Sequence, residues 1–321
     1  MPMTKSRPKA MTSPTATALD VRSALKQGIA QLDAAAVPSS ALAAEIFLIY
    51  VLGRDRTWLY THASDPLEQT AWEKYSALLT RRASGEPTQY LIGTQEFWGL
   101  EFEVTPAVLI PRPETEHLIE VAVERIGVER REARLGIADV GTGSGGIAVA
   151  LAKEFPNAEI LATDISAAAL EVARRNASRH GATDRIEFIE ADLLHPKSPD
   201  KNSSHSPLIT RHSLHSQRLF DLIISNPPYI AESEAESLQR EVRDHEPAVA
   251  LFGGVTGLEI YERLIEQAED SLVPGGLLVV ELGYGAAERV REFIVARGAW
   301  TDVSVTNDLA GIPRVLAAAK A

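Results

Sequence analysis

The sequence predicts an α/β protein whose doubly wound parallel sheet follows a small N-terminal helical domain. After Pro106, short apolar runs alternate with segments of helical period, whereas the residues before 85 show helical spacing alone. A length of 321 residues also makes two domains the natural expectation. We place a disordered tail at 1–17, a helical domain at 18–86, a β-hairpin linker at 87–107 and the α/β domain at 108–321.

The composition restricts the possible classes of function. Lys and Arg number 32 against 44 Asp and Glu, and this acidic balance argues against extended binding of a phosphate backbone. The absence of Cys excludes disulfides, thiolate metal sites and a cysteine nucleophile. No apolar run reaches transmembrane length. The first 19 residues lack acids, as a weak transit peptide does, although a disordered tail is the preferred interpretation.

Two segments of the N-terminal domain are expected to be helices. Ser39 and Ser40 can cap a helix that Gly53 ends, and the stretch Asp65–Arg82 repeats apolar residues near helical spacing. Taken alone, this region is a helical bundle without chemistry of its own.

The segment from 88 to 105 has a strand-like pattern. We expect strands in Tyr90–Ile92 and in Phe97–Val104, and the glycines at 93 and 99 suit a hairpin or a linker.

Seven short apolar segments are candidate strands of the α/β domain. The first five are separated mostly by helical stretches such as Ile147–Glu154 and Ala167–Arg179, which implies a parallel, doubly wound sheet. The last two lie close together and suit an antiparallel pair at one edge. The candidates are Gly136–Val140, Glu159–Asp164, Arg185–Glu190, Phe220–Ser225, Leu277–Leu282, Thr301–Val305 and Arg314–Ala317.

Residues 196–217 interrupt this alternation. They are rich in Ser, His, Pro and Lys, and we expect a flexible surface insertion. His205, His212 and His215 could bind a metal ion, but only Asp200 accompanies them, so no metal site is predicted.

A glycine-rich segment follows the first strand and opens a helix. It contains Gly141, Thr142, Gly143, Ser144 and Gly145, and glycines let backbone approach a ligand closely. A tight strand-to-helix turn is the structural alternative.

Three residues farther along could complete a nucleoside site. Asp164 closes the next strand, where a carboxylate can accept both ribose hydroxyls. Asp192 could meet an adenine amino group, and Leu193 could supply an apolar wall. A helix-capping Asp and a solvated loop acid are the alternatives for the two carboxylates.

The tetrapeptide Asn226-Pro227-Pro228-Tyr229 ends the apolar run Phe220–Ser225. The two prolines stop the strand, which leaves an amide side chain, carbonyl acceptors and an aromatic face. That set suits a planar NH2 group held by its hydrogens, although a plain proline turn is also compatible.

The glycine-rich segment and Asp164 indicate an adenosine-bearing cofactor and leave a dinucleotide and S-adenosylmethionine as candidates. A dehydrogenase needs a site for hydride transfer, and no obvious His, Lys or Tyr relay accompanies the segment. The tetrapeptide instead favours methyl transfer to an NH2 group.

From about residue 18 to 319 the chain resembles the bacterial protein-(glutamine-N5) methyltransferases that modify class 1 peptide chain release factors. The tetrapeptide indicates only the reaction class, whereas the segments around Trp98 and Arg112 are more specific. The matching segments are Glu86–Gly93, Glu96–Leu100, Leu109–Glu116, Asn226–Ile230, Arg243–Pro247, Glu281–Gly285 and Asp308–Arg314, together with the glycine-rich loop.

The resemblance implies a seven-stranded class I S-adenosylmethionine-dependent methyltransferase domain and a helical substrate-recognition domain. It also implies that the substrate is the glutamine of the Gly-Gly-Gln loop of a release factor. By position, Gly141 to Gly145, Asp164, Leu193 and Asn226 would line the cofactor. The tetrapeptide would hold the glutamine amide. The chain departs from the family in its long insertion after Asp192, in Leu193 where an aromatic residue is frequent, and in Val255-Thr256-Gly257.

In this interpretation Asn226 and Pro227 accept the two N–H hydrogens of the substrate amide while Tyr229 packs against its plane. Arg112 lies in a loop that is expected to close over the site or to touch the partner, and a plain Pro-rich connector is the alternative. Glu246 and Glu281 could accept protons, but structural roles are expected for both.

Two alternatives stay open. One is an adenine-N6 nucleic-acid methyltransferase that stacks a flipped base on Tyr229; the other is a binding module without activity. We expect a cytoplasmic monomer whose partner is a release factor, with no nucleic-acid or membrane partner and no metal.

Overall fold

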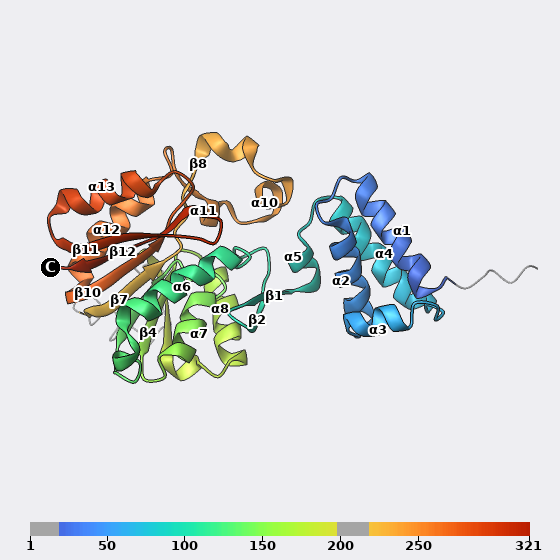
Figure 1. Cartoon of the computed structure of the whole chain (residues 1–321), viewed down its shortest axis with the longest axis horizontal. Coiled ribbons are helices and arrows are strands. Elements are labelled where there is room, and N and C mark those ends of the chain that lie inside the picture. The colour runs from blue at the N-terminus through green and yellow to red at the C-terminus, as the bar shows by residue number, and fades with distance from the viewer. Residues whose placement is uncertain (1–18, 198–217) are drawn as a thin grey trace, which may run out of the picture. The chain divides into compact units, whose positions relative to one another are not determined.

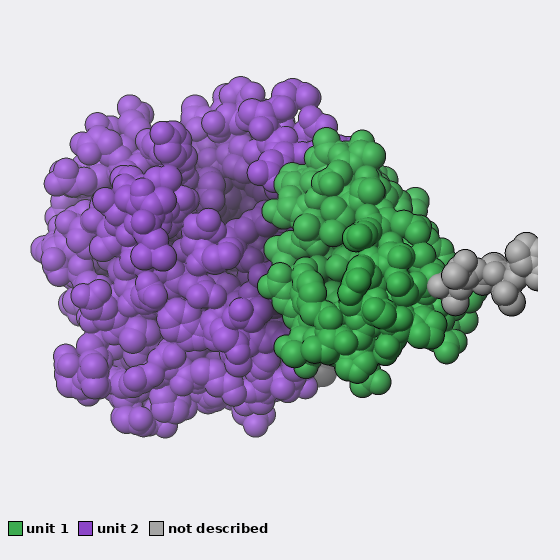
Figure 2. Space-filling view, turned by 45° about the vertical axis from the view of Figure 1, so that its right-hand side comes forward, with its two compact units in different colours: residues 1–91 green, residues 92–321 purple. Residues whose placement is uncertain are grey.

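The computed structural model describes residues 19–197 and 218–321, which form two compact units (Figures 1 and 2). The first unit ends at Leu91 and the second spans Ile92–Ala321. The expected tail, residues 198–217 of the expected insertion and its three histidines lie outside the described residues. Within the described ranges, no helix has the length and apolar character needed to cross a membrane.

The first unit is helical, and its helices enclose their own core. The buried side chains include Leu32, Phe47 and Tyr75. Helix α2 follows Ser39, whose side chain makes no cap hydrogen bond, and it ends at Gly53 as predicted. The helices are α1 (Val21–Ala34), α2 (Ser40–Leu52), α3 (Arg56–Thr61), α4 (Gln69–Ala83) and α5 (Thr88–Ile92).

A β-hairpin opens the second unit. Strands β1 (Thr94–Phe97) and β2 (Leu100–Glu103) pair antiparallel, and Trp98 and Gly99 form the turn with φ of 55° and 66°. The hairpin is therefore confirmed, but the predicted strand at Tyr90–Ile92 is wrong because these residues belong to helix α5. The predicted strand Phe97–Val104 is also wrong as one element, because the turn at Trp98 and Gly99 divides it and only Leu100–Glu103 forms β2. The Leu91 N–H donates to the Pro87 carbonyl and closes a helical turn there. A short apolar run has no periodicity that distinguishes a strand from a helix.

The main sheet of the second unit is mostly parallel. Its described strands are β3 (Gly136–Val140), β4 (Glu159–Asp164), β5 (Ile186–Asp192), β6 (His195–Pro196), β7 (Phe220–Ser225), β10 (Leu272–Glu281), β11 (Trp300–Asn307) and β12 (Pro313–Lys320). Their order is β11-β12-β10-β7-β3-β4-β5-β6. Every predicted strand of the sheet is present. The last two do pair antiparallel, although β12 lies between β10 and β11, so only β11 is at the edge.

Helices cover both faces of this sheet, as a doubly wound fold requires (Figure 1). Strand β7 shows why: Leu222 and Ile224 enter one buried cluster, whereas Ile223 enters the other. The first cluster contains side chains of α6 (Pro113–Ile126), α7 (Gly146–Glu154) and α8 (Ala167–Arg179), and the second those of α12 (Glu259–Ser271) and α13 (Ala287–Arg297). The alternation follows from the period of two of a strand.

Short elements complete the second unit. They are η1 (Val128–Arg130), η2 (Thr183–Arg185), η3 (Glu232–Ser237), α10 (Arg240–His245), α11 (Ala248–Leu251), β8 (Ile230–Ala231) and β9 (Phe252–Gly254). Strands β8 and β9 pair with each other in a separate small sheet.

The strand order places a crevice at the end of β3. Strand β3 pairs with β4 on one side and with β7 on the other, so the connections run in opposite directions from it. Ligands of open α/β sheets bind at such a switch point, outside the carboxyl ends of the strands. The glycine-rich loop follows β3 and Asn226 follows β7, so both lie at this point.

Candidate active site

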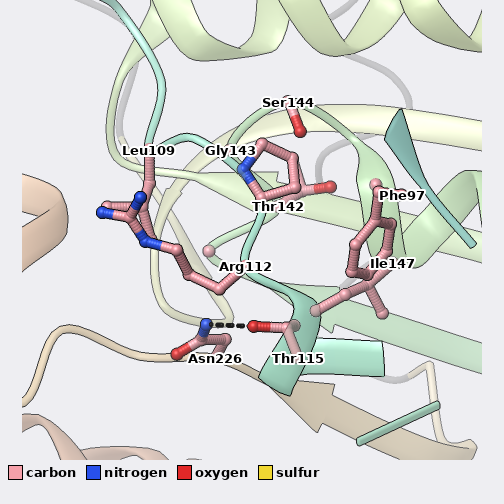
Figure 3. Close-up of a pocket in the computed structure, with 12 residues that line it drawn as sticks. Phe97, Leu109, Arg112, Thr115, Thr142, Gly143, Ser144, Ile147 and Asn226 are labelled. Atoms are coloured by element: carbon pink, nitrogen blue, oxygen red, sulfur yellow. Dashed lines mark hydrogen bonds between the residues drawn. The ribbon is translucent and has the colours of Figure 1, made fainter. Parts of the chain in front are cut away.

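Two adjoining cavities occupy the carboxyl ends of β3, β4 and β7. The larger has a volume of about 240 Å³ and the smaller, drawn in Figure 3, about 60 Å³. Leu109, Gly141, Gly143 and Asn226 line both. The structure thus brings the glycine-rich loop and the tetrapeptide to one space, although 85 residues separate Gly141 from Asn226 in the sequence.

The glycine-rich loop presents bare backbone to these cavities. Gly141 and Gly143 have φ of 75° and 55°, and a Cβ built on either would meet no atom within 4 Å. Side chains there would therefore occupy the space that the cavities provide. The N–H groups of Gly141 and Thr142 donate to the Thr163 carbonyl at 2.9 and 2.8 Å, which ties the loop to β4.

The buried carboxyl group of Asp139 holds the glycine-rich loop through hydrogen bonds. Oδ2 of Asp139 accepts hydrogen bonds from the Thr142 hydroxyl at 2.6 Å and from the Ala148 N–H at 3.0 Å. Burial raises the pKa of Asp139 to about 7, and these two hydrogen bonds oppose the shift. Among the described residues, Oδ1 of Asp139 has no hydrogen-bond partner. Asp139 was not among the predicted site residues.

Asp164, for which a ribose-binding function was predicted, lines the larger cavity. One carboxylate oxygen accepts from the Gly143 N–H at 2.9 Å and the other from the Ser166 N–H at 2.9 Å. Burial raises the pKa of Asp164, and the backbone hydrogen bonds oppose that shift. A carboxylate has about four lone-pair sites, so Asp164 can still accept a further hydrogen bond.

The expected adenine contacts line the same larger cavity. Asp192 forms an ion pair with Arg263 of α12 at 2.5 Å, so its carboxylate is already partnered. Leu193 adopts a φ of 57°, a left-handed conformation that costs about 1–2 kcal/mol for a residue with a Cβ. Such strained residues concentrate at functional sites. Phe252 and Ile260, which were not among the predicted site residues, add apolar side chains to the wall of this cavity.

The four residues of the tetrapeptide have different surroundings. Asn226 lines both cavities and Pro228 lines the larger, whereas Pro227 is buried. Tyr229 packs against the cluster on the α12 face and lines neither of these two cavities. The Tyr229 hydroxyl donates to Oε1 of Glu281 at 3.4 Å, and burial raises the pKa of Tyr229.

Hydrogen bonds set the orientation of the Asn226 amide. Its Nδ2 donates to Thr115 Oγ1 at 3.0 Å, and the Thr115 hydroxyl donates to Oε2 of Glu281 at 2.7 Å. Figure 3 shows the amide nitrogen directed at Thr115 and the amide oxygen directed away from it. Thr115 was not among the predicted site residues, although it belongs to the matching segment that contains Arg112.

Arg112 also lines the smaller cavity. It precedes helix α6, and its guanidinium pairs with the buried Glu246 at 2.6 Å. Burial raises the pKa of Glu246, while Arg112 lowers it. The ion pair fastens the segment before α6 to the chain after α10, which fits a structural function for Glu246.

Comparisons with known proteins identify relatives for both units. Residues 23–93 match the family described as PrmC N-terminal domain, and residues 137–245 match a family described as methyltransferase domain. The release factor glutamine methyltransferase of Koribacter versatilis is 43% identical over 302 residues, which cover 94% of this chain and 99% of that protein. The enzyme of the same name from Geobacter sulfurreducens is 42% identical, over 87% and 89% of the two chains.

A solved structure shares the fold of much of the chain. The catalytic domain of hMettl16, determined in complex with a MAT2A 3′UTR hairpin, superposes with a TM-score of 0.51 and 19% identity. The match covers 75% of this chain and 81% of that one. At this identity the likeness concerns the fold alone.

Proposed function

The chain belongs to the release factor glutamine methyltransferase family, and we propose that it methylates a glutamine side-chain nitrogen in a class 1 peptide chain release factor. The observation that carries the proposal is the position of Asn226. Its amide borders both cavities beside the glycine-rich loop and keeps its oxygen away from Thr115. An acceptor so placed is what an attacking NH2 group requires.

We propose S-adenosylmethionine as the methyl donor, held mainly in the larger cavity. The open cradle at Gly141 and Gly143 admits a ligand against bare backbone, and Asp164 retains acceptor capacity for ribose hydroxyls. Asp192 and Leu193 border the same cavity and would face the base. We include Thr142, Ser144 and Gly145 of the glycine-rich loop among the proposed cofactor-binding residues. When bound, this cofactor supplies an electrophilic methyl group on a sulfonium.

Asn226 and Pro227 would orient the substrate amide. An amide nitrogen is a poor nucleophile because its lone pair is delocalised into the carbonyl group. The Asn226 side-chain oxygen and the Pro227 carbonyl can accept its two N–H hydrogens, which fixes the nitrogen and stabilises the positive charge that develops on it. Pro228 lines the larger cavity beside Asn226. Tyr229, which was expected to pack against the substrate amide, lines neither cavity, and its hydroxyl pairs with Glu281 instead.

The proposed partner is a protein. We assign recognition of the release factor, through its Gly-Gly-Gln loop, to the helical unit and to Arg112. We place this reaction in the cytoplasm and expect a monomer. The adenine-N6 alternative is not favoured, because the named relatives are release factor enzymes and the chain carries a formal charge of −12.

Replacing Asn226 by Ala tests the proposal. With labelled S-adenosylmethionine and release factor, we expect transfer to fall by at least about a hundredfold while the cofactor still binds. Asn157→Ala is the matched control, because that exposed side chain donates to the Glu132 carbonyl away from the cavities. Wild-type activity of the Asn226 variant would refute the assigned function of Asn226. Label in adenine-containing nucleic acid and none in release factor would refute the proposed substrate.

A further inference from the structure

One buried carboxylate holds both polar side chains of the tetrapeptide. Oε1 of Glu281 accepts from the Tyr229 hydroxyl at 3.4 Å, and Oε2 accepts from Thr115, which in turn accepts from Asn226. Glu281 is 1% exposed and Thr115 5%. The parallel pairing of β10 with β7 sets Val280 opposite Ser225, so Glu281 and Asn226 follow at the same level.

The hydrogen bonds that link Asn226, Thr115 and Glu281 all point the same way, from Asn226 towards the Glu281 carboxylate. An ionised carboxylate only accepts, so the single hydrogen of the Thr115 hydroxyl goes to Glu281. The Thr115 oxygen then offers a lone pair, and only the NH2 end of Asn226 can donate to it. The amide oxygen of Asn226 is consequently left for another donor.

We propose that Thr115 and Glu281 are positioning residues for methyl transfer, which turn the Asn226 amide so that its oxygen faces the substrate. This inference rests on the proposed function, because it assigns the Asn226 oxygen to the substrate NH2 group. If Glu281 gained a proton, its O–H could donate to Thr115. The Thr115 hydroxyl would then donate to the amide oxygen of Asn226, which would turn its NH2 end outward. An NH2 group cannot accept from the substrate NH2 group.

The surroundings of Glu281 place its protonation within the neutral pH range. Burial raises the pKa of Glu281 to about 7, and Glu114 of α6 adds to the shift. The Thr115 and Tyr229 hydrogen bonds and Arg314 of β12 oppose it, and Arg314 itself pairs with Asp308 at 3.1 Å. From α12, the Tyr261 hydroxyl donates to the Glu281 backbone carbonyl. The ionised, orienting form is therefore lost as the pH falls through about 7.

Kinetics of Thr115 variants provide the first test. Thr115→Val removes the hydroxyl at nearly constant size, and we expect kcat to fall by about ten- to a hundredfold. The KM for release factor and the Kd for S-adenosylmethionine should stay unchanged, and Thr115→Ser should restore kcat. The control is Thr306→Val, since the Thr306 hydroxyl on β11 donates to the Val315 carbonyl at 3.4 Å, away from both cavities. A Thr115→Val enzyme with wild-type kcat would overturn the inference.

Side-chain NMR gives a measure that does not depend on activity. In the full-length protein labelled with ¹⁵N at asparagine, the Asn226 NH2 signals are assigned by their loss in Asn226→Ala. We expect these signals to titrate with a midpoint near pH 7 in the wild type and to be independent of pH in Thr115→Val and in Glu281→Gln. An Asn226 signal that does not titrate in the wild type would contradict the inference. Titration in an enzyme that fails to methylate release factor would refute only the proposed function.

Discussion

Two carboxyl groups beside the candidate active site are almost fully buried, and each accepts hydrogen bonds from residues of the site. Asp139 accepts from Thr142 and Ala148 at the base of the glycine-rich loop. Glu281 accepts from Thr115 and Tyr229 beneath the tetrapeptide. Burying a carboxylate destabilises its charged form, so neither residue stabilises the fold when it is ionised. We infer that both are present for the geometry that their hydrogen bonds impose.

Asp139→Asn should change how stability depends on pH. The folded-state pKa of Asp139 is raised to about 7 from 3.8, so its contribution to stability is complete below about pH 4 and is lost as the pH rises through about 7. The amide cannot ionise, although its oxygen can still accept from Thr142. The unfolding free energy of the variant relative to wild type should therefore increase between about pH 5 and about pH 8.

Urea unfolding at both pH values measures this difference. The exposed Asp184→Asn is the control, and its difference from wild type should stay constant. A constant difference for Asp139→Asn as well would show that Asp139 does not titrate in this range.

The glycines of the loop between β3 and α7 meet two different demands. Gly141 and Gly143 combine positive φ with open space, as the proposed cofactor site requires. Gly145 also has positive φ, at 82°, but a Cβ there would lie 3.1 Å from the Cβ of Ala173 on α8. The third glycine therefore allows α7 to begin in close contact with α8, and the position of the whole loop depends on that contact.

Gly145→Ala should destabilise the protein by about 2–4 kcal/mol, because left-handed strain and overpacking against Ala173 add. Gly181→Ala is the matched control: Gly181 has a φ of 65° but nothing within 4 Å of its Cβ position, so it should lose only about 1 kcal/mol. Chemical denaturation measures both values. Equal losses would show that the contact with α8 is not tight.

The two compact units have separate hydrophobic cores, and we propose a different function for each. The residues that line the two cavities belong to the second unit, whereas the family match over residues 23–93 falls mainly on the first. Since a domain with its own core can fold alone, the second unit should keep its cofactor site without the first.

A fragment of residues 92–321 should therefore bind S-adenosylmethionine with the affinity of the full chain. Its kcat/KM for release factor should fall by at least about tenfold, because partner surface is lost. Calorimetry and methyl-transfer kinetics measure the two quantities. Full kcat/KM would refute recognition by the helical unit, and loss of cofactor binding would show that the units depend on each other.

Much of the fold and of the site was readable from local sequence patterns. Alternating apolar runs identified the strands, and the glycine-rich loop, Asp164 and Asn226 were found because each directly follows or ends a strand. The carboxyl ends of parallel strands converge, so position along the chain was enough to predict that these residues meet. The pattern failed at Tyr90–Ile92, where a three-residue apolar run has no period to read.

The hydrogen bonds that orient the site could come only from the tertiary structure. Thr115 lies 111 residues from Asn226 and 166 from Glu281, and no local pattern connects them. The same holds for Phe252 at the cavity wall and for Tyr229, which packs away from both cavities. Strand order and side-chain packing decide such contacts. The sequence alone thus determined the class of reaction, methyl transfer to an NH2 group. The packing of the sheet and of α6 decided how the Asn226 amide is oriented.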